Sequence, residues 1–367
     1  MTQPFSSRFT LEGHPLLDAY IKKQLKVLVR FLCERHTLKD LAGIWLGGSY
    51  GRGEGGVIKS GERELPWGDY DIFLIYTEAR DVARHYQKHY TAWEQELHTL
   101  LKFNVQLRTP GSLSQLFRRS HELCWYDLCQ KHQKLWISPG LNREENTAQL
   151  PQLSPSNGVS LLFRAAGMSL TQNHFSPAEF YRTVLAACDS ILIASSSYHF
   201  TLQGRLQNMY RLQQALGVSW LRELFYLQQE AARYRLSPSR KPELPPSHTP
   251  QKLRRMIARA YLAVYTGVEQ HGDREAFTGL KLAQLLRQAE NLSFLNRSKK
   301  QTGLLLYLLP FLVCPADMGW PTLHQLKPYL SMRLYRKLSP LNAEAQREIL
   351  LAYFLEKWTQ FQGQLNP

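Results

Sequence analysis

Two short groups of polar residues have the types and the spacing that phosphate and metal binding require. Residues 47–53 read GGSYGRG and follow the apolar run IWL at residues 44–46. Residues 69–71 read DYD and open a second apolar run, IFLIY, at residues 72–76. The pattern indicates an anion-binding turn followed by a pair of carboxylates.

The glycine-rich turn has the composition of a phosphate cradle. An apolar run that ends in two glycines predicts a buried strand that passes into a tight turn. Glycine there lets the backbone approach a ligand closely and lets successive N–H groups point at an anion such as a triphosphate. Ser49 would add a hydroxyl to this cradle. Arg52, which we expect near the start of a helix, would add a positive charge.

The paired aspartates have the spacing of a metal site on a strand. Side chains alternate along a strand, so Asp69 and Asp71 are predicted to lie on one face of a strand over residues 69–76. Two carboxylates at this spacing suit Mg²⁺, which prefers oxygen ligands and is usually held jointly by carboxylates and substrate phosphates. The other interpretation is a pair of solvated acids at a strand edge.

The order of these elements resembles a known signature. A strand, a Gly-Gly-Ser turn, an Arg-Gly pair and a second strand headed by Asp-x-Asp are similar to the DNA polymerase β-like nucleotidyltransferase superfamily, over residues 14–140. The resemblance implies that Gly48 and Ser49 hold the phosphates of a nucleoside triphosphate (NTP) such as ATP, and that Asp69 and Asp71 hold two divalent ions, Mg²⁺ or Mn²⁺. It also implies a third carboxylate on a later strand, which completes the metal site and helps to activate the attacking hydroxyl.

The sequence departs from that signature at two places. Residues 54–64 lengthen the gap between the turn and the aspartates, and we expect them to form a flexible loop over the site. The later strand, predicted over residues 101–107, contains no acid, and Asn104 falls where the third carboxylate is expected. An amide oxygen is able to bind a metal, but an amide neither neutralises the charge of the ion nor accepts a proton.

The departure at Asn104 leaves three outcomes open: an active enzyme with a substitute base, a slow enzyme, or a protein that binds nucleotide without turnover. Four other acids are candidates for the substitute base, although no spacing singles one out. They are Glu54, Glu64, Glu122 and Asp127.

The composition is that of a globular protein with more than one core. The chain has 367 residues, of which 44% are hydrophobic, enough for two or more domains. The sequence contains no window of about 18 apolar residues, the length that spans a bilayer, and residues 1–6 lack the basic and apolar regions of a secretory signal. The five cysteines are too few and too scattered to predict a disulfide framework. We therefore predict a cytoplasmic protein without a membrane partner.

Most of the positive charge lies in the second part of the chain. The formal net charge is +15; residues 1–145 contain 20 Lys or Arg against 17 Asp or Glu, and residues 146–367 contain 25 against 13. This excess indicates a polyanionic partner such as RNA, and the basic clusters that we would test for phosphate contacts are Arg254, Arg255, Arg259 and residues 297–300. The alternative interpretation is that these are solvated faces of ordinary helices.

The expected fold class is α+β, with a small mixed β-sheet nucleotidyltransferase-like domain at residues 1–145 and a mostly α-helical domain at residues 158–367. A linker is predicted over residues 141–157, and a proline-rich loop at residues 236–250 interrupts the helices. In the first domain we predict helices over residues 16–32 and 78–100, a turn and helix start at 109–112 and a last strand at 135–137. Apolar periodicity in the second domain predicts helices over residues 178–197, 203–216, 219–234, 252–268, 280–290, 303–313 and 342–361.

The leading functional hypothesis is an Mg²⁺-dependent nucleotidyltransferase that moves a nucleoside monophosphate from an NTP to a hydroxyl of RNA, a small molecule or a protein. Asp69 and Asp71 would hold the metal, with Asn104 as a further ligand, and Gly48, Ser49 and Arg52 would grip the triphosphate. One alternative is a catalytically degenerate fold that serves as a nucleotide-binding, nucleic-acid-binding or regulatory module. A third hypothesis is a helical scaffold with an incidental Asp-x-Asp.

Overall fold

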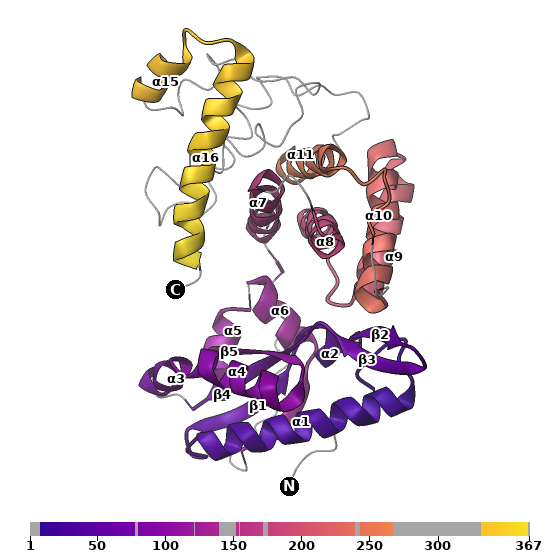
Figure 1. Cartoon of the computed structure of the whole chain (residues 1–367), viewed down its shortest axis with the longest axis vertical. Coiled ribbons are helices and arrows are strands. Elements are labelled where there is room, and N and C mark those ends of the chain that lie inside the picture. The colour runs from indigo at the N-terminus through magenta and orange to yellow at the C-terminus, as the bar shows by residue number, and fades with distance from the viewer. Residues whose placement is uncertain are drawn as a thin grey trace. The chain divides into compact units, whose positions relative to one another are not determined.

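The structure is a computed structural model that describes residues 8–77, 80–120, 122–138, 152–153, 155–171, 175–238, 243–266 and 332–365 (Figure 1). Its contacts divide the chain into two compact units. The sheet unit consists of residues 1–153 with two later segments, residues 199–204 and 232–242, and the helical unit consists of residues 154–198, 205–231 and 243–367.

The sheet unit contains a four-stranded mixed sheet in the order β5-β4-β1-β6. Strand β4 pairs antiparallel with β1 and parallel with β5, and β1 pairs antiparallel with β6. The strands are β1 (Leu41–Leu46), β4 (Asp69–Tyr76), β5 (Asn104–Ser112) and β6 (Gln133–Ile137), and a separate hairpin consists of β2 (Gly56–Ser60) and β3 (Arg63–Trp67). The helices of this unit are α1 (Pro15–Arg35), α2 (Gly48–Arg52), α3 (Arg80–Gln87), α4 (Tyr90–Leu101), α5 (Leu113–Arg118) and α6 (Leu123–Gln130).

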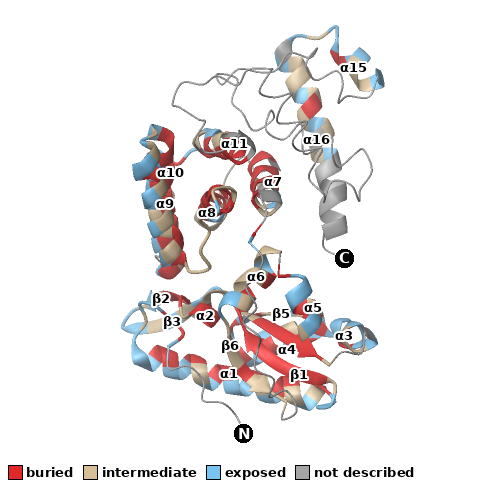
Figure 2. Cartoon of the chain, turned by 180° about the vertical axis from the view of Figure 1, so that it is seen from behind, coloured by how far each residue is buried: buried red, intermediate tan, exposed pale blue. Residues whose placement is uncertain are grey.

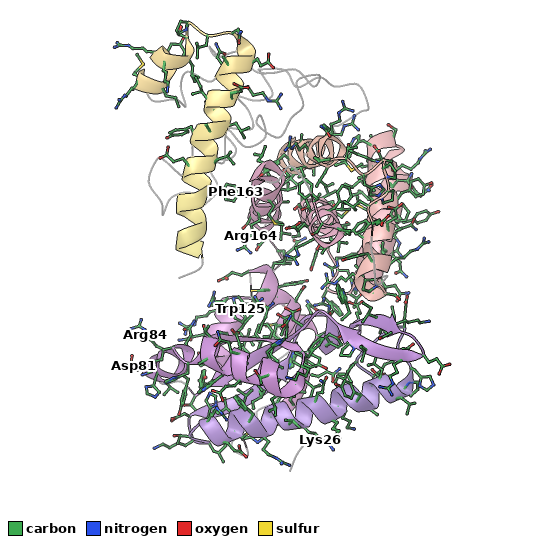
Figure 3. All side chains as sticks on the ribbon, in the orientation of Figure 1. Lys26, Asp81, Arg84, Trp125, Phe163 and Arg164 are labelled. Carbon is green, nitrogen blue, oxygen red and sulfur yellow. The ribbon has the colours of Figure 1, made fainter. Side chains whose placement is uncertain are left out.

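The central strands are buried on both faces, which Figure 2 shows in red. One face, which includes Ile72 and Leu74, belongs to a core shared with α1 and α4. On the other face, Phe73 packs with Trp125 of α6, which is labelled in Figure 3, at a ring separation of 5.6 Å. Alternation along β4 therefore places Asp69 and Asp71 on the α5–α6 face, where the strand begins.

Helix α1 is tied to the sheet by a buried amide. Gln24 Nε2 donates to the carbonyl oxygen of Leu101 (2.8 Å), and Tyr70 Oη donates to Gln24 Oε1 (2.7 Å). Both ends of the amide are thus satisfied inside the core, as a buried polar group requires. These two hydrogen bonds fix the end of α4 and the start of β4 relative to α1.

The helical unit is built around α7, α8 and α11, which contact one another. Its elements are α7 (Pro155–Thr171), α8 (Pro177–Ala194), most of α9 (Leu202–Leu216) and of α10 (Ser219–Leu236), α11 (Pro250–Thr266), α15 (Met332–Leu338) and α16 (Ala343–Leu365). Ser176 and Glu179 form a capping box at the start of α8. A buried ion pair between Asp189 and Arg205, 2.6 Å long, joins α8 to α9.

Most elements agree with the sequence predictions, and four expectations are wrong. Residues 54–64 are not a flexible loop, because they include strand β2 and the start of β3. Residues 78–100 contain two helices, which separate at residues 88–89. Residues 109–112 continue β5 instead of forming a turn, although the predicted helix start is confirmed, because Ser112 caps α5. Helix α7 begins at Pro155, inside the predicted linker, and the sequence patterns predict neither α7 nor α15. The helices predicted at residues 280–290 and 303–313 lie outside the described residues.

The proline-rich loop agrees with the prediction, since α10 ends at Leu236 and α11 begins at Pro250. Proline lacks the N–H that a continuing helix needs, so this stretch ends one helix and opens the next. None of the described helices is both long and apolar enough to cross a bilayer.

A buried histidine in the sheet unit predicts a pH-dependent stability. His36 Nδ1 lies 2.7 Å from the carbonyl oxygen of Leu32, and Nε2 lies 2.9 Å from Tyr76 Oη. Burial lowers the pKa of His36, so the unfolded chain binds the proton more strongly. The free energy of unfolding should therefore fall as the pH drops below about 6.5, by at most about 1.4 kcal/mol per pH unit from this group.

Urea unfolding at pH 7.5, 6.5 and 5.5 measures this effect. His36→Gln should flatten the pH dependence, whereas His98→Gln, at an exposed position of α4, should leave it as in the unmodified protein. Equal slopes for the unmodified protein and His36→Gln would show that another group causes the dependence.

Candidate functional site

The turn after β1 and the start of β4 lie side by side because the two strands are antiparallel neighbours. Leu46, the last residue of β1, pairs with Ile72 of β4. The next residue, Gly47, donates its N–H to the carbonyl oxygen of Asp71 at 2.9 Å. The topology therefore brings the glycine-rich turn against the paired aspartates, as the sequence predicts.

Gly48 marks the closest approach of the turn to the carboxylates. Its φ of +59° lies in the left-handed region, which side chains disfavour. A Cβ added to Gly48 would collide with Asp71 Oδ2. Glycine at this position thus leaves room for the Asp71 carboxylate directly beside the backbone of the turn.

The fold disfavours the charge of Asp71. The Asp71 side chain is 23% exposed. Burial raises the pKa of Asp71, and the neighbouring Asp69 raises it further, while Arg108, Arg235 and Arg52 act in the opposite direction. A bound cation would stabilise the ionised form of such a carboxylate, because its positive charge offsets both the burial and the repulsion from Asp69.

Strand β5 places an amide and a guanidinium beside the aspartates. The parallel register sets Asp69 opposite Asn104 and Asp71 opposite Gln106. Gln106 Nε2 donates to Asp69 Oδ2, and Gln106 Oε1 accepts from Arg108 Nη2 at 2.5 Å. Arg108 Nη2 also lies 3.5 Å from Asp71 Oδ1. Gln106 and Arg108 therefore link the two carboxylates through one polar network.

The remaining predicted site residues lie at the edge of this network. Asn104 is exposed, and its side chain makes no hydrogen bond within the described part of the chain. Ser49 is partly exposed at the start of α2, and its hydroxyl likewise has no hydrogen-bond partner among the described residues. Both side chains are at least partly accessible to solvent.

Arg52 is held by carboxylates of the sheet unit. It is the last residue of α2, and not near the start of a helix as expected. Its Nε lies 3.3 Å from Glu54 Oε2, and its Nη1 lies 3.7 Å from Asp127 Oδ2, with the side chain only 5% exposed. Arg52 contributes positive charge near Asp71, but its own ion pairs are with Glu54 and Asp127.

Glu54 fixes a distant segment of the chain next to the turn. Its Oε1 accepts from the backbone N–H of Leu202 at 2.8 Å, at the first residue of α9, while its Oε2 holds Arg52. Glu54→Gln removes the carboxylate charge nearest to Arg52. The buried Arg52 guanidinium then keeps the longer ion pair with Asp127. The free energy of unfolding should fall by about 2–3 kcal/mol.

This effect is measured by urea unfolding against Glu62→Gln, the same change at an exposed position in the β2–β3 turn. The control should shift the free energy by less than about 0.5 kcal/mol. A Glu54→Gln protein as stable as the control would contradict the anchoring role.

The four candidate substitute bases all have structural partners. Glu54 and Asp127 pair with Arg52. Glu64 accepts from the N–H of His14 (2.7 Å), and Glu122 pairs with Arg119 at 2.9 Å. The described residues contain no group of three or more His, Cys, Asp or Glu side chains that could hold a metal. The structure therefore joins none of these four acids to the paired aspartates as a third carboxylate.

The donor set fits one divalent cation that is shared with phosphates. Asp69 and Asp71 supply two carboxylates on one face, and Mg²⁺ is commonly bound by one or two carboxylates together with substrate oxygens. Gln106 would add an amide oxygen after its hydrogen bonds rearrange. A site for two divalent cations would need more negative charge than these residues provide.

Two residues of this site were missed by sequence reasoning. Gln106 and Arg108 alternate with Val105 and Leu107, which is a strand pattern, but the predicted strand ends at residue 107 and only Asn104 is considered as a ligand there. The signal that could have found them is the period of two, which puts residues 104, 106 and 108 on one face.

The basic helical clusters give little support to a phosphate surface. Arg254 donates from Nε and Nη2 to the carbonyl oxygen of Ser169 at 3.1 and 3.0 Å, so it joins α11 to α7. Arg255 is exposed and Arg259 partly exposed, and residues 297–300 lie outside the described residues. The polyanion partner stays a prediction.

Comparison with known proteins adds no family. No protein-family model matches the sequence, and neither a curated protein nor a solved structure is significantly similar to the chain. Any function must therefore be inferred from the chemistry of the site alone.

Proposed function

We propose that this chain is a nucleotidyltransferase that binds an NTP together with Mg²⁺ at the edge formed by the turn at Gly48 and Ser49 and the carboxylates of Asp69 and Asp71. The observation that carries the proposal is the approach of Gly48 to Asp71, where a Cβ would collide with the carboxylate. A phosphate held by the turn would lie within reach of a cation held by the aspartates.

The reaction would transfer a nucleoside monophosphate to a hydroxyl of RNA, a small molecule or a protein. The hydroxyl oxygen forms a bond to the α-phosphorus, the α–β anhydride bond breaks, and pyrophosphate leaves with the electron pair. The hydroxyl proton passes to solvent, because strand β5 offers no carboxylate beside Asp69. A bound Mg²⁺ would supply charge stabilisation to the phosphates.

The residues of the chain contribute positioning and charge. The turn at Gly48 and Ser49 orients the phosphates through backbone N–H groups and one hydroxyl. Asp69 and Asp71 would hold the cation, whose positive charge would offset the burial that disfavours the ionised form of Asp71. Such preorganised interactions account for most catalysis in phosphoryl-group transfer.

An assay with NTPs labelled at the α-phosphate tests the proposal. The protein is incubated with each NTP and Mg²⁺ or Mn²⁺, with and without total RNA, and transfer of label to protein, RNA or small molecules is measured. The unmodified protein should transfer label, and Asp69→Ala/Asp71→Ala should not. Equal transfer by the two proteins would refute the assignment.

A second function, nucleotide binding without turnover, is favoured by the side chains of β5. Asn104 lies opposite Asp69, where the third carboxylate is expected, and Gln106 and Arg108 follow it on the same face of β5, so no group there accepts the proton of an attacking hydroxyl. In this alternative the chain binds the NTP–Mg²⁺ complex and signals its presence through a conformational or partner-binding response.

Gln106→Glu separates the two functions, since it places a carboxylate opposite Asp71 with little change of shape. Turnover that appears or rises sharply in Gln106→Glu supports the binding module. Little gain, or a loss, supports the active enzyme.

A further inference from the structure

The strand beside the aspartates carries a positive charge where the metal-binding face would need a negative one. Asn104, Gln106 and Arg108 are the residues that the parallel register places on the same face as Asp69 and Asp71. Of these three, Arg108 is the one with a formal charge. Its guanidinium lies 3.5 Å from Asp71 Oδ1, and its side chain is 45% exposed.

The position of Arg108 sets how many cations the site is able to hold. Divalent ions that share a site repel each other, and acidic ligands must offset that repulsion. Two aspartates provide two negative charges, and a guanidinium beside one of them cancels part of this total. The hydrogen bond from Arg108 Nη2 to Gln106 Oε1, 2.5 Å long, holds the guanidinium on that side.

We infer that Arg108 takes the place of a second divalent cation, so that the site binds one metal ion with its NTP and Arg108 exchanges its ion pair with Asp71 for a phosphate oxygen. The inference deepens the proposed function and rests on it. Arginine suits this role because its planar guanidinium donates two parallel hydrogen bonds to phosphate.

In this arrangement Arg108 has opposite effects on the binding of metal and on the binding of nucleotide. Without nucleotide, the guanidinium competes with a metal ion for Asp71. With nucleotide, it leaves the carboxylate for the phosphates and contributes to binding. A residue with a purely structural role would not weaken the binding of one ligand and strengthen the binding of the other.

The experiment counts bound Mn²⁺ by the decrease of its free electron paramagnetic resonance signal. In the nucleotide-free protein, Arg108→Ala should raise the Mn²⁺ affinity about tenfold, because it removes a competing charge beside Asp71. With α,β-methylene analogues of the four NTPs, which resist cleavage at the α–β bond, the same variant should bind the Mn²⁺–nucleotide complex about tenfold more weakly.

Two further variants serve as controls. Arg108→Lys keeps the charge and should keep the low Mn²⁺ affinity of the nucleotide-free protein. Arg63→Ala removes a positive charge from an exposed position of the β2–β3 hairpin, and it should change neither affinity by more than about twofold.

The outcomes distinguish this inference from the proposed function. One Mn²⁺ per chain in the nucleotide complex, with opposite shifts in Arg108→Ala, supports both. Two Mn²⁺ per chain, or an unchanged Mn²⁺ affinity in Arg108→Ala, overturns the role of Arg108 while nucleotide binding stands. An unmodified protein that binds Mn²⁺ but none of the four analogues overturns the proposed function, and with it the phosphate interaction of Arg108.

Discussion

Gly48→Ala should abolish NTP binding while leaving the sheet unit folded. The substitution introduces a Cβ at a φ of +59° that would collide with Asp71 Oδ2. The carboxylate must then rotate away from the turn, or the turn must move away from the strand. Either movement separates the phosphate cradle from the metal ligands, so we expect the affinity for NTP–Mg²⁺ to fall at least about 100-fold.

Gly61→Ala is the matched control for this substitution. Gly61 has a φ of +66°, and a Cβ there would have no neighbour within 4 Å. Both substitutions carry the left-handed backbone cost of about 1 kcal/mol, but only Gly48→Ala crowds a carboxylate. Calorimetric titration with an NTP analogue and thermal unfolding of both proteins make the comparison. An equal decrease of affinity in the two variants would mean that backbone strain, and not Asp71, explains the effect.

Asp71→Asn should weaken NTP binding and label transfer without destabilising the fold. The amide has nearly the shape of the carboxylate, but it is a weak metal ligand, and we expect NTP–Mg²⁺ affinity and label transfer to fall at least about 100-fold. Burial and Asp69 raise the pKa of Asp71 in the folded chain. A raised pKa means that the ionised carboxylate costs folding free energy above its ordinary pKa near 4, so the variant should be more stable at pH 7 by up to about 1 kcal/mol.

The ion pair between Asp71 and Arg108, which Asp71→Asn removes, does not reverse that sign. Arg108, at 3.5 Å from Asp71, is 45% exposed, and ion pairs of exposed groups contribute little to stability. Asp81→Asn, at an exposed position of α3 labelled in Figure 3, makes the same chemical change away from the site and should alter neither quantity. A destabilised Asp71→Asn protein would show that Asp71 has a structural role instead.

The convergence of the turn and the aspartates could be predicted from the sequence because it follows from local patterns. The apolar content of residues 44–46 and 69–76 predicts two strands, and the glycines between them mark a turn. The antiparallel pairing of Leu46 with Ile72 then brings Gly47 to Asp71. Apolar periodicity likewise predicts helices α9, α10 and α11.

The partners of the site could not be predicted, because long-range packing decides them. The sequence predicts that Arg52 faces an anion, yet Asp127, far along the chain, lies 3.7 Å from its guanidinium. The glycines around the β2–β3 hairpin favour a loop, whereas the Tyr50 hydroxyl anchors both strands by accepting from the N–H of Trp67 and donating to the carbonyl oxygen of Gly56. No local pattern contains these interactions.

The central claim is that Asp69 and Asp71 hold the cation of an NTP whose phosphates rest on the turn at Gly48 and Ser49. The measurement is calorimetric titration of the full chain with the α,β-methylene analogues of the four NTPs at saturating Mg²⁺, beside Asp69→Asn/Asp71→Asn. We predict one saturable site per chain for at least one analogue, weakened at least about 100-fold in the double variant. Absence of binding for all four, or equal binding by both proteins, would contradict the claim.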